Sequence, residues 1–148
     1  MTMRDSILAA RVGDLTFGSF GVPPSVGPAP EPPGGGTANL GAQPLIAVQE
    51  FRFAATDPTF AGHFPTRPIL PGIFQLEMTR LMAEEVLQNS LSIREITKAK
   101  FLWPIVPEQM IRVELKLVAK DETFQARANF FADGRSAGEA ILQLARTS

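Results

Sequence analysis

Apolar and polar residues alternate through much of the C-terminal third of the chain. A period of two predicts strands that bury one face and expose the other. Asp133 and Gly134 form a pair typical of a tight hairpin turn, which predicts a last strand over about residues 135–145. The alternating stretches before that turn are residues 97–103, 111–117 and 124–130. Together these stretches predict an antiparallel sheet whose strands follow one another along the chain.

The preceding part of the chain has one strand pattern, one stiff loop and one helix pattern. Residues 45–53 are rich in β-forming residues and predict a strand. The loop that opens at Asp57 carries closely spaced prolines, which exclude a regular helix there. Pro71 suits the first position of a helix, and the helix is expected to run to about Asn89. One helix wrapped by a curved antiparallel sheet is an α+β arrangement, and it buries the apolar faces of both.

The N-terminal part of the chain has a different composition. Residues 21–43 consist mainly of Pro, Gly, Ala and Ser, and such a stretch buries too little apolar surface to offset its ordering entropy. Its triple glycine lacks the Lys-Ser/Thr ending of a phosphate-binding loop, so a spacer is the better interpretation. Residues 7–20 can supply one strand before it. We therefore expect an N-terminal segment over residues 1–44 and the main domain over residues 45–148.

Composition excludes several classes of function. The 148 residues suit a single domain, and a formal net charge of −1 gives no indication of nucleic acid or an anionic membrane as partner. The absence of cysteine excludes disulfides and a thiol nucleophile, and one histidine cannot build a multi-histidine metal site. No apolar run is long enough for a signal peptide or a bilayer span, so a cytoplasmic location is expected. No metal or cofactor is expected either.

His63 is the only histidine in the sequence and lies in the proline-rich loop. An imidazole titrates near neutral pH, so a rigidly held one is suited to act as a general base. The alternative is a loop histidine that binds a backbone carbonyl. The sequence around His63 leaves both interpretations open.

Glu77 lies in the second turn of the expected helix, after a run of apolar residues. A desolvated carboxyl group there would stay protonated and could serve as a general acid. Helical spacing also aligns Glu77 with Arg80, Glu84 and Gln88, which favours a solvated polar stripe with a Glu77–Arg80 ion pair. Spacing alone does not choose between these alternatives.

A resemblance to a known family favours the catalytic interpretation of both residues. Residues 60–77 read FAGHFPTRPILPGIFQLE, which resembles the GHFPxxPxxPG signature of bacterial 3-hydroxyacyl-(acyl-carrier-protein) dehydratases, with an acidic residue at the position of Glu77. Residues 99–107 resemble the third-strand region of that family. Details of both stretches look most similar to stand-alone dehydratase-like proteins of aryl-polyene and polyketide-type pathways. The resemblance covers residues 45–148.

The resemblance implies a hotdog fold and a site shared between two subunits. It implies a dimer in which His63 of one subunit takes the α-proton of the acyl thioester and Glu77 of the other protonates the departing 3-hydroxyl. The backbone N–H of Gly72 would polarise the thioester carbonyl, and the backbone at Phe64 would complete this pocket. The substrate would arrive on acyl carrier protein, and the product would be the trans-2-enoyl thioester.

Three departures from the family pattern favour a specialised enzyme. Leu81 stands where the fatty-acid enzymes usually carry glutamine, Thr66 replaces a common glycine, and Pro107-Glu108 shortens a Pro-Gly-Asp motif. Two alternatives remain. A hotdog thioesterase would use the same groove with a placed water, and a non-catalytic subunit would form a heterodimer with an active paralogue.

Overall fold

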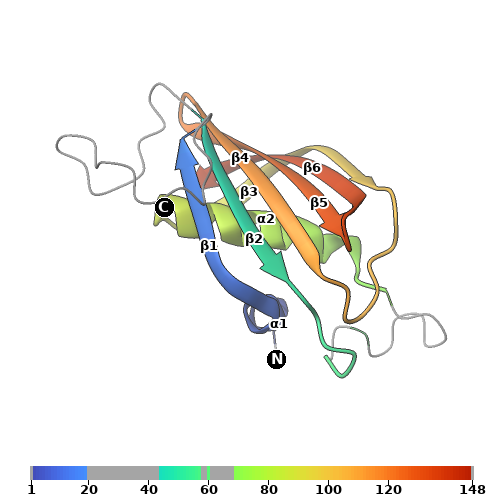
Figure 1. Ribbon diagram of the computed structural model, residues 1–148. Coiled ribbons are helices and arrows are strands. Elements are labelled where there is room, and N and C mark those ends of the chain that lie inside the picture. The colour runs from blue at the N-terminus through green and yellow to red at the C-terminus, as the bar shows by residue number, and fades with distance from the viewer. Residues whose placement is uncertain (1, 20–43, 58–59, 61–68, 148) are drawn as a thin grey trace.

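The computed structural model describes residues 2–19, 44–57, 60 and 69–147. Six strands form one antiparallel sheet in the order β1-β2-β4-β5-β6-β3. Figure 1 shows the sheet with the long helix α2 against it. The strands are β1 (Arg11–Ser19), β2 (Leu45–Phe51), β3 (Leu91–Phe101), β4 (Ile111–Lys120), β5 (Thr123–Ala132) and β6 (Arg135–Arg146).

The alternating pattern of the C-terminal strands correctly predicts which face is buried. In β4, every second residue from Ile111 to Leu117 is buried, and β5 alternates in the same way. Asp133 and Gly134 have φ values of 50° and 82°, as the expected hairpin turn between β5 and β6 requires. Because side chains alternate across a strand, this register directs one row of apolar residues toward the helix.

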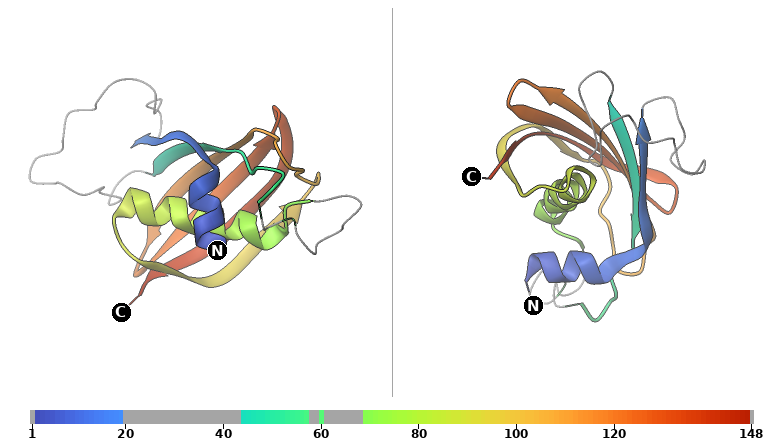
Figure 2. Two further views of the ribbon diagram at one scale, coloured as in Figure 1. Left: turned by 90° about the horizontal axis from the view of Figure 1, so that it is seen from below. Right: turned by 90° about the vertical axis from the view of Figure 1, so that its left-hand side faces the viewer.

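The helix α2 (Gly72–Leu87) lies inside the curve of the sheet, as Figure 2 shows. Met78, Met82 and Val86 are fully or almost fully buried and form part of the core. Two helix boundaries differ slightly from the prediction. Pro71 is the N-cap rather than the first helical residue, and Gln88 ends the helix in the left-handed conformation with φ of 53°. The expected α+β arrangement is confirmed.

The N-terminal residues contain a helix that the strand interpretation of residues 7–20 missed. Helix α1 (Met3–Ala10) precedes β1, so only the second part of that stretch is a strand. A reciprocal capping box between Thr2 and Asp5 starts α1. Strand β1 pairs with β2, so it belongs to the main sheet although it precedes residue 45. The division at residue 44 stays a prediction, and residues 20–43, with the whole Pro/Gly stretch, lie outside the described residues.

The strand β3 differs most from its prediction. It begins at Leu91 and ends at Phe101, whereas the alternating pattern predicted residues 97–103. It is an edge strand that pairs only with β6 among the described strands. From Glu95 onward it is exposed on both faces, so the alternation there marks no buried side.

Candidate active site

The N-terminus of α2 is fixed by backbone contacts on both sides of Pro71. The N–H of Leu70 donates to the carbonyl of Ile105 at 2.7 Å, and the N–H of Phe74 donates to the carbonyl of Pro71 at 3.0 Å. Leu70 and Ile105 are both buried. No side chain caps this helix end within the described part of the chain. The first N–H groups of the helix, where its dipole is positive, are therefore held in a fixed place.

Gly72, the expected oxyanion donor, is the first residue of α2 and lies under the ring of Phe101. A Cβ atom at this position would be 2.7 Å from Cε2 of that ring. The lack of a side chain thus lets the end of β3 approach the helix start closely. Its assigned role in polarising a thioester carbonyl stays a prediction.

His63 and Phe64, the two predicted loop contributions, lie outside the described residues. Phe60, before this segment, and Leu70, after it, are both part of the hydrophobic core. Leu70 lies two residues before Gly72, the first residue of the helix that also carries Glu77.

Glu77 is four-fifths buried, and Arg80 contacts both of its carboxylate oxygens. One of the two hydrogen bonds, from Arg80 Nε to Glu77 Oε2, measures 3.1 Å. The polar-stripe interpretation predicts this Glu77–Arg80 ion pair, and the structure contains the pair. The other interpretation expected apolar surroundings for the Glu77 carboxyl group. In the structure, the guanidinium of Arg80 lies beside it instead.

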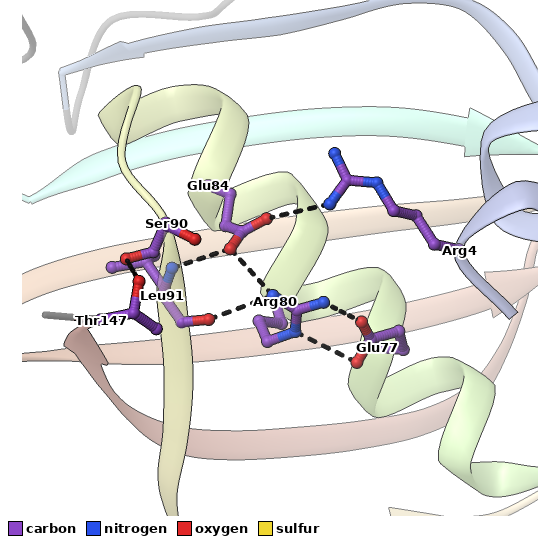
Figure 3. A network of polar contacts seen from close by, with 7 residues as sticks. All are labelled: Arg4, Glu77, Arg80, Glu84, Ser90, Leu91 and Thr147. Atoms are coloured by element: carbon purple, nitrogen blue, oxygen red, sulfur yellow. Dashed lines mark hydrogen bonds and ion pairs between the residues drawn. The ribbon is translucent and has the colours of Figure 1, made fainter. Parts of the chain in front are cut away.

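The guanidinium of Arg80 has two further acceptors. Its Nη1 donates to Glu84 Oε2 at 2.8 Å and to the carbonyl of Leu91 at 3.0 Å, and the backbone N–H of Leu91 donates to the same Glu84 oxygen at 2.7 Å. Arg4 of α1 lies 3.8 Å from the other Glu84 oxygen. Figure 3 shows this network. Hydrogen bonding to Glu77, opposed by burial, raises the pKa of Arg80 above its ordinary value, so the guanidinium stays charged.

Gln75 is a buried polar residue that the sequence reasoning missed. Its side chain is 2% exposed, and its Oε1 atom has no hydrogen-bond partner among the described residues. The only signal in the sequence is its position as the single polar residue in the apolar run before Glu77. Leu81, at the position of the family's glutamine, is an apolar core residue and offers no hydrogen bond.

The described residues contain no candidate metal site and no candidate membrane-spanning helix. No group of three or more His, Asp or Glu side chains in those residues could hold a metal ion. None of the helices described is both long and apolar enough to cross a membrane.

Comparison with known proteins identifies the family to which the chain belongs. A sequence model of the ApeI-like family, described as ApeI dehydratase, matches residues 43–137. The model covers more than half of the chain. The chain therefore belongs to the ApeI-like family of hotdog dehydratases.

Two relatives that carry the name of an enzyme are just under 30% identical to this chain. The 3-hydroxyacyl-(acyl-carrier-protein) dehydratase FabZ of Sulfurovum sp. is 28% identical over 60% of this chain and 68% of its own length. The protein of the same name from Solibacter usitatus is 29% identical, and the match spans 51% of each chain. The matched region thus covers 51% to 68% of the length of these two relatives.

Two solved structures share the fold. A chain of the dehydratase heterocomplex ApeI:P from Xenorhabdus doucetiae is 26% identical, with a TM-score of 0.60 over 68% of this chain and 88% of that one. The (R)-hydratase from A. caviae involved in PHA biosynthesis is 14% identical, with a TM-score of 0.54 over 69% of this chain and 94% of that one. The second likeness concerns the fold alone. The hotdog fold expected from the sequence is confirmed.

Proposed function

We propose that the protein dehydrates (3R)-3-hydroxyacyl thioesters of acyl carrier protein to trans-2-enoyl thioesters. The observation that carries the proposal is the placement of Gly72 and Glu77 on the first two turns of α2, the helix that in the sequence follows the proline-rich stretch containing His63. Family membership supports the reaction class. The substrate we favour is one of an aryl-polyene, polyketide or other fatty-acid-like pathway, and the expected location is the cytoplasm.

The proposed chemistry needs one base, one acid and one oxyanion site. His63 removes the α-proton, and the electron pair of that C–H bond becomes the new carbon–carbon double bond. Glu77 in its protonated form gives its proton to the departing 3-hydroxyl, which leaves as water. The N–H of Gly72, together with the backbone at Phe64, stabilises the negative charge that develops on the thioester oxygen.

The proposed functional unit is a homodimer, or a heterodimer with a paralogue, joined along β3. The free edge of this strand and the loop after it expose several large apolar side chains, which a second subunit could cover. These residues are Ile96, Phe101, Leu102 and Trp103, each about half exposed. The solved Xenorhabdus doucetiae neighbour is described as a heterocomplex, which supports testing both forms.

The activity test is incubation with alkyl and aryl 3-hydroxyacyl carrier-protein thioesters, followed by mass spectrometry. Loss of one water from the acyl chain is the expected result, and release of the free acid would instead establish a thioesterase. No reaction alone, but dehydration after addition of a paralogue, would establish a non-catalytic subunit. His63→Ala and Glu77→Gln should each lower turnover by about 10²–10⁴-fold, as loss of an acid or base group typically does.

Mixed dimers test the shared site. A dimer of one His63→Ala chain and one Glu77→Gln chain has one site with both defects and one intact site. Random mixing makes about half the dimers mixed, so about a quarter of all sites should recover activity. No recovery, in a sample that native mass spectrometry shows to contain mixed dimers, would refute a site composed from two subunits.

A further inference from the structure

Arg80 joins the candidate acid to the rest of the fold. Its guanidinium binds both oxygens of Glu77 on one side and binds Glu84 and the Leu91 carbonyl on the other. These acceptors come from the same helix and from the first residue of β3. The side chains of Arg80 and Glu77 are each 20% exposed, so the contact is largely shielded from water.

We propose that Arg80 is the positioning residue for the Glu77 carboxyl group. This inference rests on the proposed function, in which Glu77 is the general acid. Arg80 itself touches no reacting atom. It sets where the carboxyl group of Glu77 points before substrate arrives.

The geometry fits a positioning role better than a surface ion pair. A guanidinium is a rigid planar fork, so contact with both carboxylate oxygens restrains the rotation and the location of the carboxylate. The fork is itself restrained, because Glu84 also accepts the N–H of Leu91 at 2.7 Å. An exposed pair three residues apart on a helix has no such second anchor.

The other residues of α2 near Glu77 do not hold its carboxyl group in place. Leu81, four residues after Glu77, is apolar and buried. The nearby polar residues Gln75 and Thr79 are also buried: Gln75 lies beside Gly138, and the hydroxyl of Thr79 donates to the carbonyl of Gln75. Among the contacts of the described residues, Arg80 alone donates a side-chain hydrogen bond to Glu77. Removing it would release the acid from a fixed orientation.

The test compares kcat and KM in Arg80 variants. Arg80→Gln should lower kcat by about 10–100-fold, because misplacement of a catalytic group by about an ångström can cost about 10²-fold, while KM changes less than about twofold. Arg80→Lys keeps the charge but loses the fork, so it should recover part of kcat. In a Glu77→Gln background, Arg80→Gln should cause no further loss, because a positioning residue acts only through the group it positions.

The matched control is Arg11→Gln, which breaks a different arginine–glutamate contact to the same helix. Arg11 Nη2 lies 3.1 Å from Glu85 Oε1 and has no contact with Glu77. This variant should keep kcat within about twofold of the wild type. If Arg80→Gln fails to fold, Arg80→Lys and Glu84→Gln carry the same test, because Glu84→Gln weakens the anchor of Arg80 and leaves the Arg80–Glu77 contact in place. Each of them should lower kcat and leave KM nearly unchanged.

The outcomes separate this inference from the proposed function. If Glu77→Gln is inactive but the Arg80 variants keep wild-type kcat, the positioning role is overturned and the proposed function stands. An equal kcat loss in Arg11→Gln, or further loss in the double variant, would also overturn it by indicating a general structural role. Full activity in Glu77→Gln would overturn both.

Discussion

Gly138 in β6 is the position at which a single added methyl group should do most damage to the fold. It lies between Phe130 of β5 and Phe101 of β3 in the sheet. A Cβ atom here would be 2.6 Å from the carbonyl oxygen of Lys100 and 3.0 Å from Oε1 of Gln75. The first of these atoms belongs to the backbone of the paired strand, so it cannot move without disturbing the β3–β6 ladder.

We expect Gly138→Ala to lower the free energy of unfolding by about 2–3 kcal/mol, toward the upper end of the usual range for overpacking. For a chain of about 150 residues, each kcal/mol shifts the melting temperature by about 2–4 °C. The expected fall is therefore roughly 4–12 °C. Thermal and urea unfolding followed by circular dichroism measure both quantities.

Gly72→Ala is the matched control, because its clash has a different character. The added Cβ would be 2.7 Å from the ring of Phe101, but this ring is half exposed and can turn away. Alanine is also favoured over glycine in a helix by about 0.5–1 kcal/mol. The net change in unfolding free energy should stay within about 1 kcal/mol. If Gly138→Ala is as stable as the wild type, or Gly72→Ala is the more damaging of the two, the argument from backbone contact is wrong.

Three further predictions concern other parts of the chain. Gln75→Leu removes a buried acceptor without a partner among the described residues and should raise the free energy of unfolding, measured in urea, by about 1 kcal/mol. A lower free energy of unfolding would instead mean that the Gln75 amide has a partner elsewhere. Deleting residues 23–36 should lower the free energy of unfolding by less than about 1 kcal/mol, because the entropic cost of closing a loop changes by only about 0.6 kcal/mol per doubling of its length and Ser19 pairs directly with Leu45. A large fall in melting temperature would contradict this. The hydrogen bond from Lys98 lowers the pKa of Glu139, so the stabilisation from this contact is present above the ordinary pKa of glutamate and is lost as pH falls through the lowered value. Lys98→Gln should raise the pKa of Glu139 in a carboxyl NMR titration, and no change would refute the assigned cause.

Sequence periodicity predicts the strands that bury one face and fails for the strand that buries neither. Strands β4 and β5 alternate because their inner residues pack against α2, and their predicted ranges lie within the observed ones. Strand β3 starts six residues before its predicted range of 97–103 and exposes almost all of its second half, since it is at the sheet edge. No local pattern distinguishes an edge strand with both faces open from one with a buried face.

The sequence at the start of helix α1 contains a helix-capping signal. Thr2 and Asp5 are spaced as a capping box, in which the two side chains and backbones cap each other. An eight-residue helix is marginal by itself, and the burial of Ile7 against the core is what stabilises it. That contact is tertiary, so the capping signal alone indicates where a helix can start and not whether it forms.

The environment of Glu77 depends on contacts that spacing cannot reveal. Helical periodicity correctly places Glu77, Arg80 and Glu84 on one stripe and predicts the Glu77–Arg80 pair. The same periodicity indicates a solvated stripe, yet Glu84 is only 13% exposed because Leu91 and Arg4 bind it from β3 and α1. A polar row that tertiary structure covers in this way restrains its members far more than a solvated row does. The contacts of Glu84 with Leu91 and Arg4 thus hold Arg80, and through it Glu77, and the kinetics of the Glu77 and Arg80 variants test whether this restraint serves catalysis.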